Sequence, residues 1–324
     1  MELVFNNYGE YSRDGHQFQD TLGEYIGQKY GVSNVQVTPS GLSAISCVLN
    51  AFLRVNPKGV VYYCSELYKE TLDLMEYLEC EKYECGDLDD IHSKDSDILI
   101  FFESCSNPHG RIPNYSLLEE LRKNNTSVIF VVDNTWLTSS IFNPFSLGAD
   151  IVVSSLTKYY SGGKAIGGVI ATGKCSLFLT IMDFYNLNGL HISPYNCKVI
   201  LDNIKTMDER ITKSSQSTYK LLELLKSLGK KVYHPFVDNY DFVDKNFKSV
   251  DGVKLIPSVL YFESKHNNKK EVKKNSIFPL KTSYGGQEHR IELDKRDDIV
   301  NIRFSIGYDD FEIKQEDVNK IIGY

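Results

Sequence analysis

The segment Ile151–Gly168 brings together residue types that can bind a phosphate and react with a carbonyl group. An apolar, β-branched run ends at Ser154, and Ser155, Thr157 and Lys158 follow before a glycine-rich turn. Hydroxyl groups can donate hydrogen bonds to a phosphate, and a lysine amine can form a Schiff base. The pattern predicts a site for a phosphate-bearing carbonyl cofactor. A surface lysine that simply follows a strand is the alternative.

A second group with chemical potential is the carboxylate of Asp133, which ends the apolar run Ser127–Val132. A carboxylate at the end of a buried strand needs a partner, because burying an unpaired charge is costly. A pyridinium nitrogen would be such a partner, and the ion pair would keep the ring protonated and a strong electron sink. The alternative is that Asp133 caps a following turn.

The third feature is a predicted strand-to-helix junction at Pro39, Ser40 and Gly41, with a helix expected from Leu42. The first backbone N–H groups of a helix have no partner inside the helix and attract phosphate. A glycine lets the backbone approach an anion closely. Ser40, Gly41 and Leu42 are therefore predicted to bind phosphate. Ser40 could equally be a simple N-cap.

The elements that would position these residues alternate between strands and helices. Predicted strands cover Gly59–Tyr63, Asp97–Phe102, Ser127–Val132, Ile151–Ser154 and Gly168–Thr172. Predicted helices cover Thr21–Tyr30, Gly41–Leu53, Tyr68–Glu79 and Ser116–Lys123. Continuous apolar strands alternating with amphipathic helices are typical of an α/β fold with a mostly parallel sheet.

The last third of the chain has a different pattern. One long or kinked helix is predicted over Cys197–Leu228, followed by strand-like segments and a final helix near Lys314–Ile322. The strand-like segments are Lys254–Glu263, Ile277–Leu280 and Ile299–Ile306, and the basic run Lys265–Lys274 is expected to be a solvated loop. The predicted divisions are an N-terminal arm over 1–35, a large cofactor domain over 36–200 and a small domain over 201–324.

Composition restricts the class of protein. The chain has 324 residues and a mass of 36.9 kDa, with 42% hydrophobic and 24% charged residues. These are ordinary globular values, and they exclude a disordered, collagen-like or coiled-coil chain. The net charge of −7 argues against a nucleic-acid partner, which would call for a basic face.

Cysteine usage and hydropathy bear on the expected location of the protein. The seven cysteines include no C-x-x-C pair, so we expect reduced thiols and no metal site. The N-terminal residues do not have the pattern of a secretion signal, and the longest apolar runs are far shorter than the roughly 20 residues that cross a bilayer. We therefore expect a soluble, cytoplasmic protein without a membrane partner.

The motifs together resemble a known family. The stretch D-N-T-W…L-G-A-D-I-V-V-S-S-L-T-K-Y is similar to the cofactor signature of the Cys/Met-metabolism family of pyridoxal-phosphate enzymes, which includes cystathionine γ-synthase, cystathionine γ- and β-lyase and methionine γ-lyase. Further segments resemble family motifs in the same order along the chain: Tyr11–Arg13, Pro39–Ile45, Tyr68–Thr71, Glu103–Pro108, Ile204–Arg210, Ser283–Glu288 and Asn301–Asp309.

This resemblance implies a fold and an assembly. The fold would be that of the aspartate-aminotransferase-like, fold type I enzymes, with a large α/β domain and a smaller α+β C-terminal domain. The assembly would be a homodimer with shared active sites, or a tetramer of two such dimers. Only ten residues precede the Y-S-R match, so the N-terminal arm is shorter than is usual in the family.

The resemblance also implies roles for individual residues. Lys158 would form the internal aldimine with pyridoxal 5'-phosphate, and Asp133 would pair with the pyridinium nitrogen. The other implied cofactor contacts are Ser40, Gly41, Leu42, Ser155 and Thr157 at the phosphate, Tyr68 stacked on the ring, Asn107 near its phenolic oxygen, and Tyr11 and Arg13 reaching the phosphate of the neighbouring subunit. Ser283 and Arg303 would hold the carboxylate of an amino-acid substrate, because the arginine fork matches a carboxylate.

The implied reaction is β- or γ-elimination, or γ-replacement, on a sulfur amino acid or an activated homoserine, most like cystathionine γ-synthase or γ-lyase. Lys158 would move the substrate's protons, and Tyr68 would be the acid or base at the leaving group. The alternatives are another pyridoxal-phosphate activity on this scaffold, or a non-catalytic cofactor-binding partner protein.

Departures from the family pattern fall around the substrate. They are Glu70, Thr282 and the Ser161–Gly168 turn. We expect Glu70 to contact a distal polar group of the substrate, unless it is only an exposed carboxylate at a helix start.

Overall fold

The computed structural model describes residues 12–13, 15–91, 97–125, 127–173, 175–296 and 299–323. The chain forms two compact units. The first contains the described residues up to Ser104 together with Pro113–Ser139 and Asn143–Lys205. The second contains Cys105–Ile112, Ser140–Phe142 and the residues from Thr206 onward. Tyr11 lies outside the described residues, so its predicted role stays a prediction.

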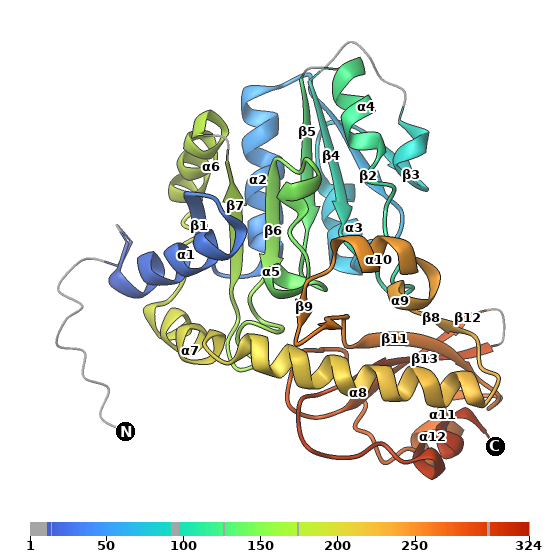
Figure 1. Cartoon of the computed structure of the whole chain (residues 1–324). Helices are drawn as coiled ribbons and strands as arrows, with labels where there is room; N and C mark the ends of the chain where they lie inside the picture. The colour runs from blue at the N-terminus through green and yellow to red at the C-terminus, as the bar shows by residue number, and fades with distance from the viewer. Residues whose placement is uncertain are drawn as a thin grey trace. The chain divides into compact units, whose positions relative to one another are not determined.

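A seven-stranded sheet forms the centre of the first unit, in the order β1-β7-β6-β5-β4-β2-β3 (Figure 1). The strands are β1 (Asn34–Thr38), β2 (Val60–Cys64), β3 (Glu81–Cys85), β4 (Ile98–Glu103), β5 (Val128–Asp133), β6 (Ile151–Ser155) and β7 (Gly168–Thr172). β2 to β6 pair in parallel, whereas β7 runs antiparallel to both β6 and β1. The prediction of an α/β fold with a mostly parallel sheet is therefore confirmed.

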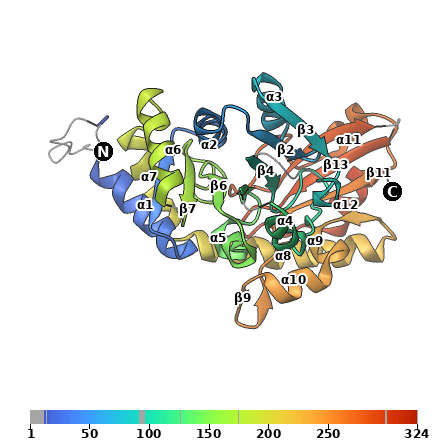
Figure 2. The same ribbon diagram turned by 90° about the horizontal axis from the view of Figure 1, so that it is seen from above.

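The first unit also contains helices, several of which contact strands of this sheet. They are α1 (Gln17–Tyr30), α2 (Gly41–Val55), α3 (Lys69–Tyr77), α4 (Leu117–Asn124), α6 (Cys175–Leu187) and α7 (Pro194–Ile204), while the short α5 (Thr138–Ile141) spans a boundary between the units. α1, α2, α4 and α6 contact strands of this sheet. α2 packs on β1, β6 and β7, and Figure 2 shows α1, α6 and α7 gathered near β7. α2 begins at Gly41 because Ser40 and Ser43 form a reciprocal capping box.

The second unit is built on a four-stranded antiparallel sheet in the order β12-β13-β11-β8. Its elements are α8 (Met207–Ser227), β8 (Val232–Tyr233), α9 (Pro235–Asp238), α10 (Tyr240–Asn246), β9 (Ser249–Val250), β10 (Val253–Lys254), β11 (Val259–Ser264), α11 (Lys269–Asn275), β12 (Arg290–Arg296), β13 (Ile299–Ser305) and α12 (Gln315–Ile322). Figure 1 shows α8 as a long gold helix. Its Ser215 Oγ donates to Ile256 O at 2.8 Å and accepts the Ile256 N–H at 3.0 Å, which fixes α8 beside the segment that leads into β11.

Three sequence expectations differ from the structure. The long or kinked helix predicted over Cys197–Leu228 is two helices, α7 and α8, because Thr206 leaves the helical conformation at the boundary between the units. Ile277–Leu280 makes only an isolated bridge to Ile291, since Pro279 has no N–H for a ladder. Part of the basic run predicted as a loop is helix α11, which Asn268 caps and whose Val272 is buried.

The sequence reading also omitted β3, α6 and β12. β3 is a mostly exposed edge strand, so it lacks the apolar run that marks the central strands. β12 alternates polar residues with Ile291 and Leu293, a pattern typical of a strand with one polar face. Within the described parts of the chain, no helix has the length and apolar content needed to cross a membrane.

Candidate active site

Two acidic side chains and a serine meet at the carboxyl ends of adjacent parallel strands in the first unit. Glu103 ends β4, Asp133 ends β5 and Ser155 ends β6. Glu103 and Asp133 are directly opposite in the strand register. The carboxyl edge of a parallel sheet is where ligands bind in open α/β folds. The sheet therefore collects three chemically useful side chains at its binding edge.

Thr135 fixes one oxygen of the Asp133 carboxylate. The Thr135 backbone N–H and hydroxyl both donate to Asp133 Oδ1, at 2.9 and 2.5 Å. The Thr135 hydroxyl in turn accepts the Ser155 N–H at 2.8 Å, which ties the turn after β5 to the end of β6. Sequence reasoning assigned no role to Thr135, although it lies in the D-N-T-W motif. The arrangement orients Asp133 and directs both of these hydrogen bonds to Oδ1, away from Oδ2.

The electrostatic state of Asp133 reflects two opposing effects. Burial by the surrounding protein raises the pKa of Asp133 to about 6, although part of the side chain stays accessible. The two hydrogen bonds from Thr135 and the positive charge of Lys158 act in the opposite direction and favour the ionised form. Asp133 is thus a carboxylate that a further cation would stabilise.

The turn after β6 positions Lys158. Leu156 N–H donates to Gly167 O at 2.9 Å, and Gly163 N–H donates to Lys158 O at 3.2 Å. The Ser161 hydroxyl lies between two backbone carbonyls, those of Thr157 at 2.9 Å and Ala165 at 3.0 Å. The Ser161–Gly168 turn, although it differs from the family pattern, is therefore closed by its own hydrogen bonds and holds the backbone of Lys158 in place.

The N-terminus of α2 lies against the end of β6. A Cβ added at Gly41 would lie 2.8 Å from Ser155 Cβ, so only glycine permits this approach. The N–H groups of Gly41 and Leu42 belong to the first turn, where no helical carbonyl can accept them. Together with the Ser155 hydroxyl, these groups form the donor set that a phosphate requires.

Two hydroxyls predicted to bind phosphate already take part in structural hydrogen bonds. Ser40 Oγ accepts the Ser43 N–H at 3.0 Å, which is the N-cap role given as the alternative in the sequence analysis. Thr157 Oγ1 contacts the backbone of Gly167, accepting its N–H at 3.3 Å and donating to its carbonyl at 3.4 Å. These bonds place Ser40 and Thr157 as supports for the loops that bear the other donors.

Glu103 is a site residue to which sequence reasoning gave no role. It is 7% exposed, and its Oε1 accepts the backbone N–H of Tyr68 at 2.6 Å. Burial, and then the neighbouring Asp133 carboxylate, raise the pKa of Glu103 well above its usual range. Glu103 begins the E-S-C-S-N-P motif, which was a signal for it in the sequence. Its partner, the Tyr68 N–H, is brought to the carboxyl only by the tertiary structure. Glu103 anchors the backbone of the residue predicted to stack on the cofactor.

Replacing Glu103 with alanine is expected to weaken cofactor binding and to lower the free energy of unfolding by about 2 kcal/mol, because the Tyr68 N–H loses its buried acceptor. Glu103→Gln keeps an acceptor oxygen at this position and should retain cofactor affinity within about threefold. Cofactor titration by absorbance and thermal denaturation would measure both effects. Equal losses in the two variants would contradict the anchoring role.

The remaining predicted residues of the first unit lie on the surface. Arg13, Leu42, Tyr68 and Glu70 are exposed, and Tyr68 precedes α3 as its N-cap residue. Glu70 lies in the first turn of α3, a position where a carboxylate is favoured by the helix dipole. The ring of Tyr68 and the carboxylate of Glu70 are therefore accessible to a ligand.

The second unit holds the residues predicted to bind a carboxylate. Arg303 lies on β13 and is 9% exposed. Its Nη1 donates to Asn107 Oδ1 at 3.2 Å, and its Nη2 donates to the backbone carbonyl of Thr282 and pairs with the Glu292 carboxylate. Ser283 follows Thr282 and is half-buried. The predicted residues Asn107 and Arg303 are thus brought together, along with Glu292, which the sequence did not reveal.

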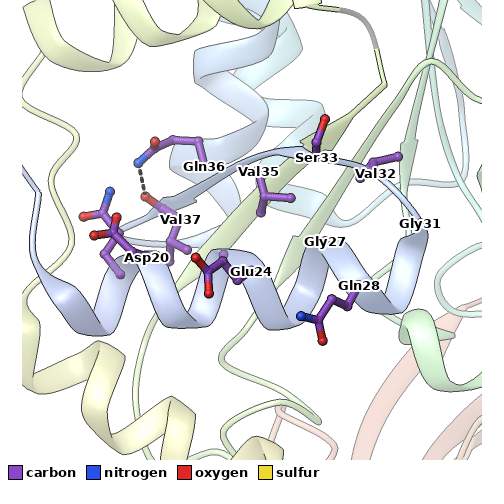
Figure 3. A pocket seen from close by; sticks show the side chains of 12 residues that line it. Asp20, Glu24, Gly27, Gln28, Gly31, Val32, Ser33, Val35, Gln36 and Val37 are labelled. Carbon is purple, nitrogen blue, oxygen red and sulfur yellow. Dashed lines mark hydrogen bonds between the residues drawn. The ribbon is translucent and has the colours of Figure 1, made fainter.

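The first unit also contains a cavity of about 810 Å³ between α1 and β1 (Figure 3). Asp20 and Glu24 line it from the helix and Gln36 from the strand. The Gln36 side-chain amide donates to the carbonyl of Val37 at 2.9 Å. This cavity shares no residue with the predicted site.

Pyridoxal phosphate fits the chemistry of the donor set in the first unit. The cofactor needs an anion at its ring nitrogen, donors at its phosphate and an amine at its aldehyde. Asp133 is oriented and keeps Oδ2 clear of the Thr135 hydrogen bonds. The start of α2 and Ser155 supply donors, and Lys158 is close enough to Asp133 to favour its ionised form.

Comparisons with known proteins agree with pyridoxal phosphate as the cofactor. The family model described as "Cys/Met metabolism PLP-dependent enzyme" matches residues 5–311. The cystathionine beta-lyase of Schizosaccharomyces pombe is 28% identical over 241 residues, covering 71% of this chain and 60% of that protein. The cystathionine beta-lyase of Lactococcus lactis subsp. cremoris is 28% identical over 300 residues, covering 88% of this chain and 76% of that protein.

Solved structures show the same fold. The crystal structure of cystathionine gamma-lyase from yeast has a TM-score of 0.85 at 23% identity, covering 97% of this chain and 87% of that one. A structure from Campylobacter jejuni that contains N'-pyridoxyl-lysine-5'-monophosphate has a TM-score of 0.83 at 23% identity, covering 97% of this chain and 86% of that one. The chain belongs to the Cys/Met-metabolism family of pyridoxal-phosphate-dependent enzymes.

Proposed function

We propose that the protein cleaves or replaces a β or γ substituent of an amino acid, with a sulfur amino acid or an activated homoserine as substrate. The observation that carries the proposal is the oriented carboxylate of Asp133 near Lys158 at the binding edge of the sheet. When bound, pyridoxal phosphate supplies an electron sink for a carbanion at the substrate's α carbon. The residues of the chain then bind, orient and move protons.

The predicted site residues of the first unit have distinct roles in the proposed reaction. Asp133 holds the ring nitrogen in its protonated form, and the N-terminus of α2 with Ser155 holds the phosphate. The Lys158 amine takes the proton from the substrate's α carbon and returns protons to carbons within its reach. Tyr68, whose backbone Glu103 anchors, stacks on the ring and serves as acid or base at the leaving group.

Residues of the second unit account for the amino-acid substrate. Arg303 offers a planar fork that matches a carboxylate in two hydrogen bonds. Ser283 adds a hydroxyl donor to the same carboxylate, and Asn107, which accepts a hydrogen bond from Arg303, helps to hold the guanidinium. In this proposal Glu70 contacts a distal polar group of the substrate.

Arg13 and Tyr11 support a proposed homodimer. Arg13 is exposed within its own chain, so its side chain is available to a phosphate in a neighbouring subunit. The same role is proposed for Tyr11. Size-exclusion chromatography with light scattering of the wild type and of Arg13→Ala would report whether the active form is a dimer.

A substrate screen tests the proposed activity. Cystathionine is the most informative substrate, because β-cleavage releases homocysteine, pyruvate and ammonia, whereas γ-cleavage releases cysteine, 2-oxobutanoate and ammonia. We expect 2-oxo acid or thiol from at least one of cystathionine, methionine, cysteine or an acylated homoserine. Cofactor binding without any such product would favour the alternative of a non-catalytic cofactor-binding protein.

A further inference from the structure

The guanidinium of Arg303 already has a carboxylate partner. Among the described residues, Nη1 contacts Asn107, Nη2 contacts Glu292 and the Thr282 carbonyl, and Nε is buried without a hydrogen-bond partner. The guanidinium is therefore already paired with one carboxylate before any substrate binds. A bidentate carboxylate ligand would have to share Nη2 with Glu292 or replace it.

The position of Glu292 follows from the strand register. Glu292 on β12 lies directly opposite Arg303 on β13 in an antiparallel pair. Side chains of directly opposed residues lie on the same face of the sheet, about 4.5–5.5 Å apart at Cβ. The Glu292 carboxylate is consequently within reach of Arg303 without any rearrangement of the backbone.

The two partners differ in how firmly they are held. The Arg303 side chain is 11% exposed and is also fixed by Asn107 and Thr282, whereas the Glu292 side chain is 35% exposed. A second carboxylate brought to the same guanidinium would be repelled by the first. Glu292 is therefore the group that would move when another carboxylate binds.

Resting on the proposed function, in which Arg303 binds the substrate's carboxylate, we propose that Glu292 is an internal carboxylate that occupies Arg303 in the free enzyme and is displaced by the substrate. It acts as a specificity-determining residue. A simple anion gains too little to replace it, whereas an amino acid also gains the contacts of its amino group. Glu292 thereby favours the binding of amino acids over simple anions at Arg303.

Arg290 offers the displaced carboxylate a second partner. It lies two residues before Glu292 on β12, so both side chains point to the same face. Its Nε is buried and has no hydrogen-bond partner in the described part of the chain. The Glu288 carboxylate, which is also stabilised by the positive charge of Arg290, forms its ion pair with Lys281 at 2.8 Å. In the proposed exchange, Glu292 leaves Arg303 for Arg290 through a change of rotamer.

Equilibrium binding to the holoenzyme tests this exchange. The probes are L-alanine, which has no leaving group, and L-alaninamide, in which a neutral amide replaces the carboxylate, both measured by calorimetry. Glu292→Gln is expected to bind L-alanine about tenfold more tightly, since no ion pair has to be broken. Its affinity for L-alaninamide should stay within about twofold of the wild type. An unchanged or weaker affinity for L-alanine would overturn the proposal.

A second variant gives an effect of opposite sign. Arg290→Gln should weaken L-alanine binding several-fold in the wild-type background and have no effect in the Glu292→Gln background. Loss of alanine affinity in both backgrounds would overturn the exchange with Arg290. If Glu292→Gln failed to fold, Arg290→Gln alone would decide, and unchanged affinity would count against the proposal. Failure of L-alanine to bind any of these cofactor-loaded proteins would instead indicate that the proposed function is wrong.

Discussion

Replacing Lys158 with alanine is expected to lower kcat by at least about 10³-fold and to abolish covalent attachment of the cofactor. The amine at this position is the one that can react with the cofactor's aldehyde and then move protons at the substrate. Its backbone is fixed by the Ser161–Gly168 turn, so removal of the side chain should leave the fold intact. Steady-state kinetics and the absorbance of the bound cofactor would measure the two losses.

Lys164 provides a matched control for this variant. It lies in the same turn, but its Nζ donates to Asn203 Oδ1 at 2.8 Å on the surface. Lys164→Ala should keep both the activity and the cofactor absorbance of the wild type. An active Lys158→Ala protein, with a normal cofactor spectrum, would contradict the assignment of Lys158.

Asp133→Asn is expected to lower kcat by about 10²–10³-fold, the range found when one preorganised electrostatic contact is removed. An amide keeps the shape of the side chain but cannot hold the ring nitrogen protonated. The variant should still bind the cofactor through Lys158 and the phosphate donors. Kinetics at saturating cofactor, together with the cofactor's absorbance between pH 5 and 9, would measure the change.

Although Asp133→Asn should lower kcat, it should not lower the stability of the apo-protein. The pKa of Asp133 in the folded protein, about 6, lies above the ordinary aspartate value of 3.8. The stability that comes from its protonated form is therefore present below about pH 4 and is lost as the pH rises through 6. Asp133→Asn lacks this loss, so apo Asp133→Asn should be at least as stable as the apo wild type at pH 8. A lower melting temperature there would show that Asp133 is a structural rather than a cofactor-binding carboxylate.

Asp150 provides a control that distinguishes a structural carboxylate from a cofactor-binding one. It lies next to the start of β6, where its Oδ2 accepts hydrogen bonds from Arg122 at 3.0 Å and from the Phe130 N–H at 2.9 Å. Asp150→Asn removes a structural ion pair and should lower the melting temperature without changing kcat for the folded holoenzyme. The contrast between the two variants distinguishes loss of chemistry from loss of fold.

The central strands and the chemistry at their ends could be predicted from the sequence. β4, β5 and β6 are continuous apolar runs, as expected for central strands of a mostly parallel sheet, which are buried on both faces. Asp133 and Lys158 come at or just after the ends of such runs. A reactive residue directly after a buried strand is readable without knowledge of the tertiary structure.

The supporting residues could not be predicted in the same way. Glu103 has its role because the loop bearing Tyr68 returns to the end of β4, a contact between residues 35 positions apart. Glu292 has its role through the register of β12 against Arg303 on β13. Such partners depend on how distant segments pair, and local hydrophobic patterns carry no information about that pairing. The sequence predicted a long or kinked helix here but did not place the break between α7 and α8, because Thr206 is only a weak local signal for a helix end.

The central claim is that Lys158 bears the cofactor, and borohydride reduction tests it most directly. The holoenzyme would be reduced, digested and analysed by mass spectrometry. We predict a single phosphopyridoxyl modification on the peptide that contains Lys158, and none on the same peptide from Lys158→Ala. An unmodified Lys158 in the reduced wild type, or a label that persists in the variant, would contradict the account.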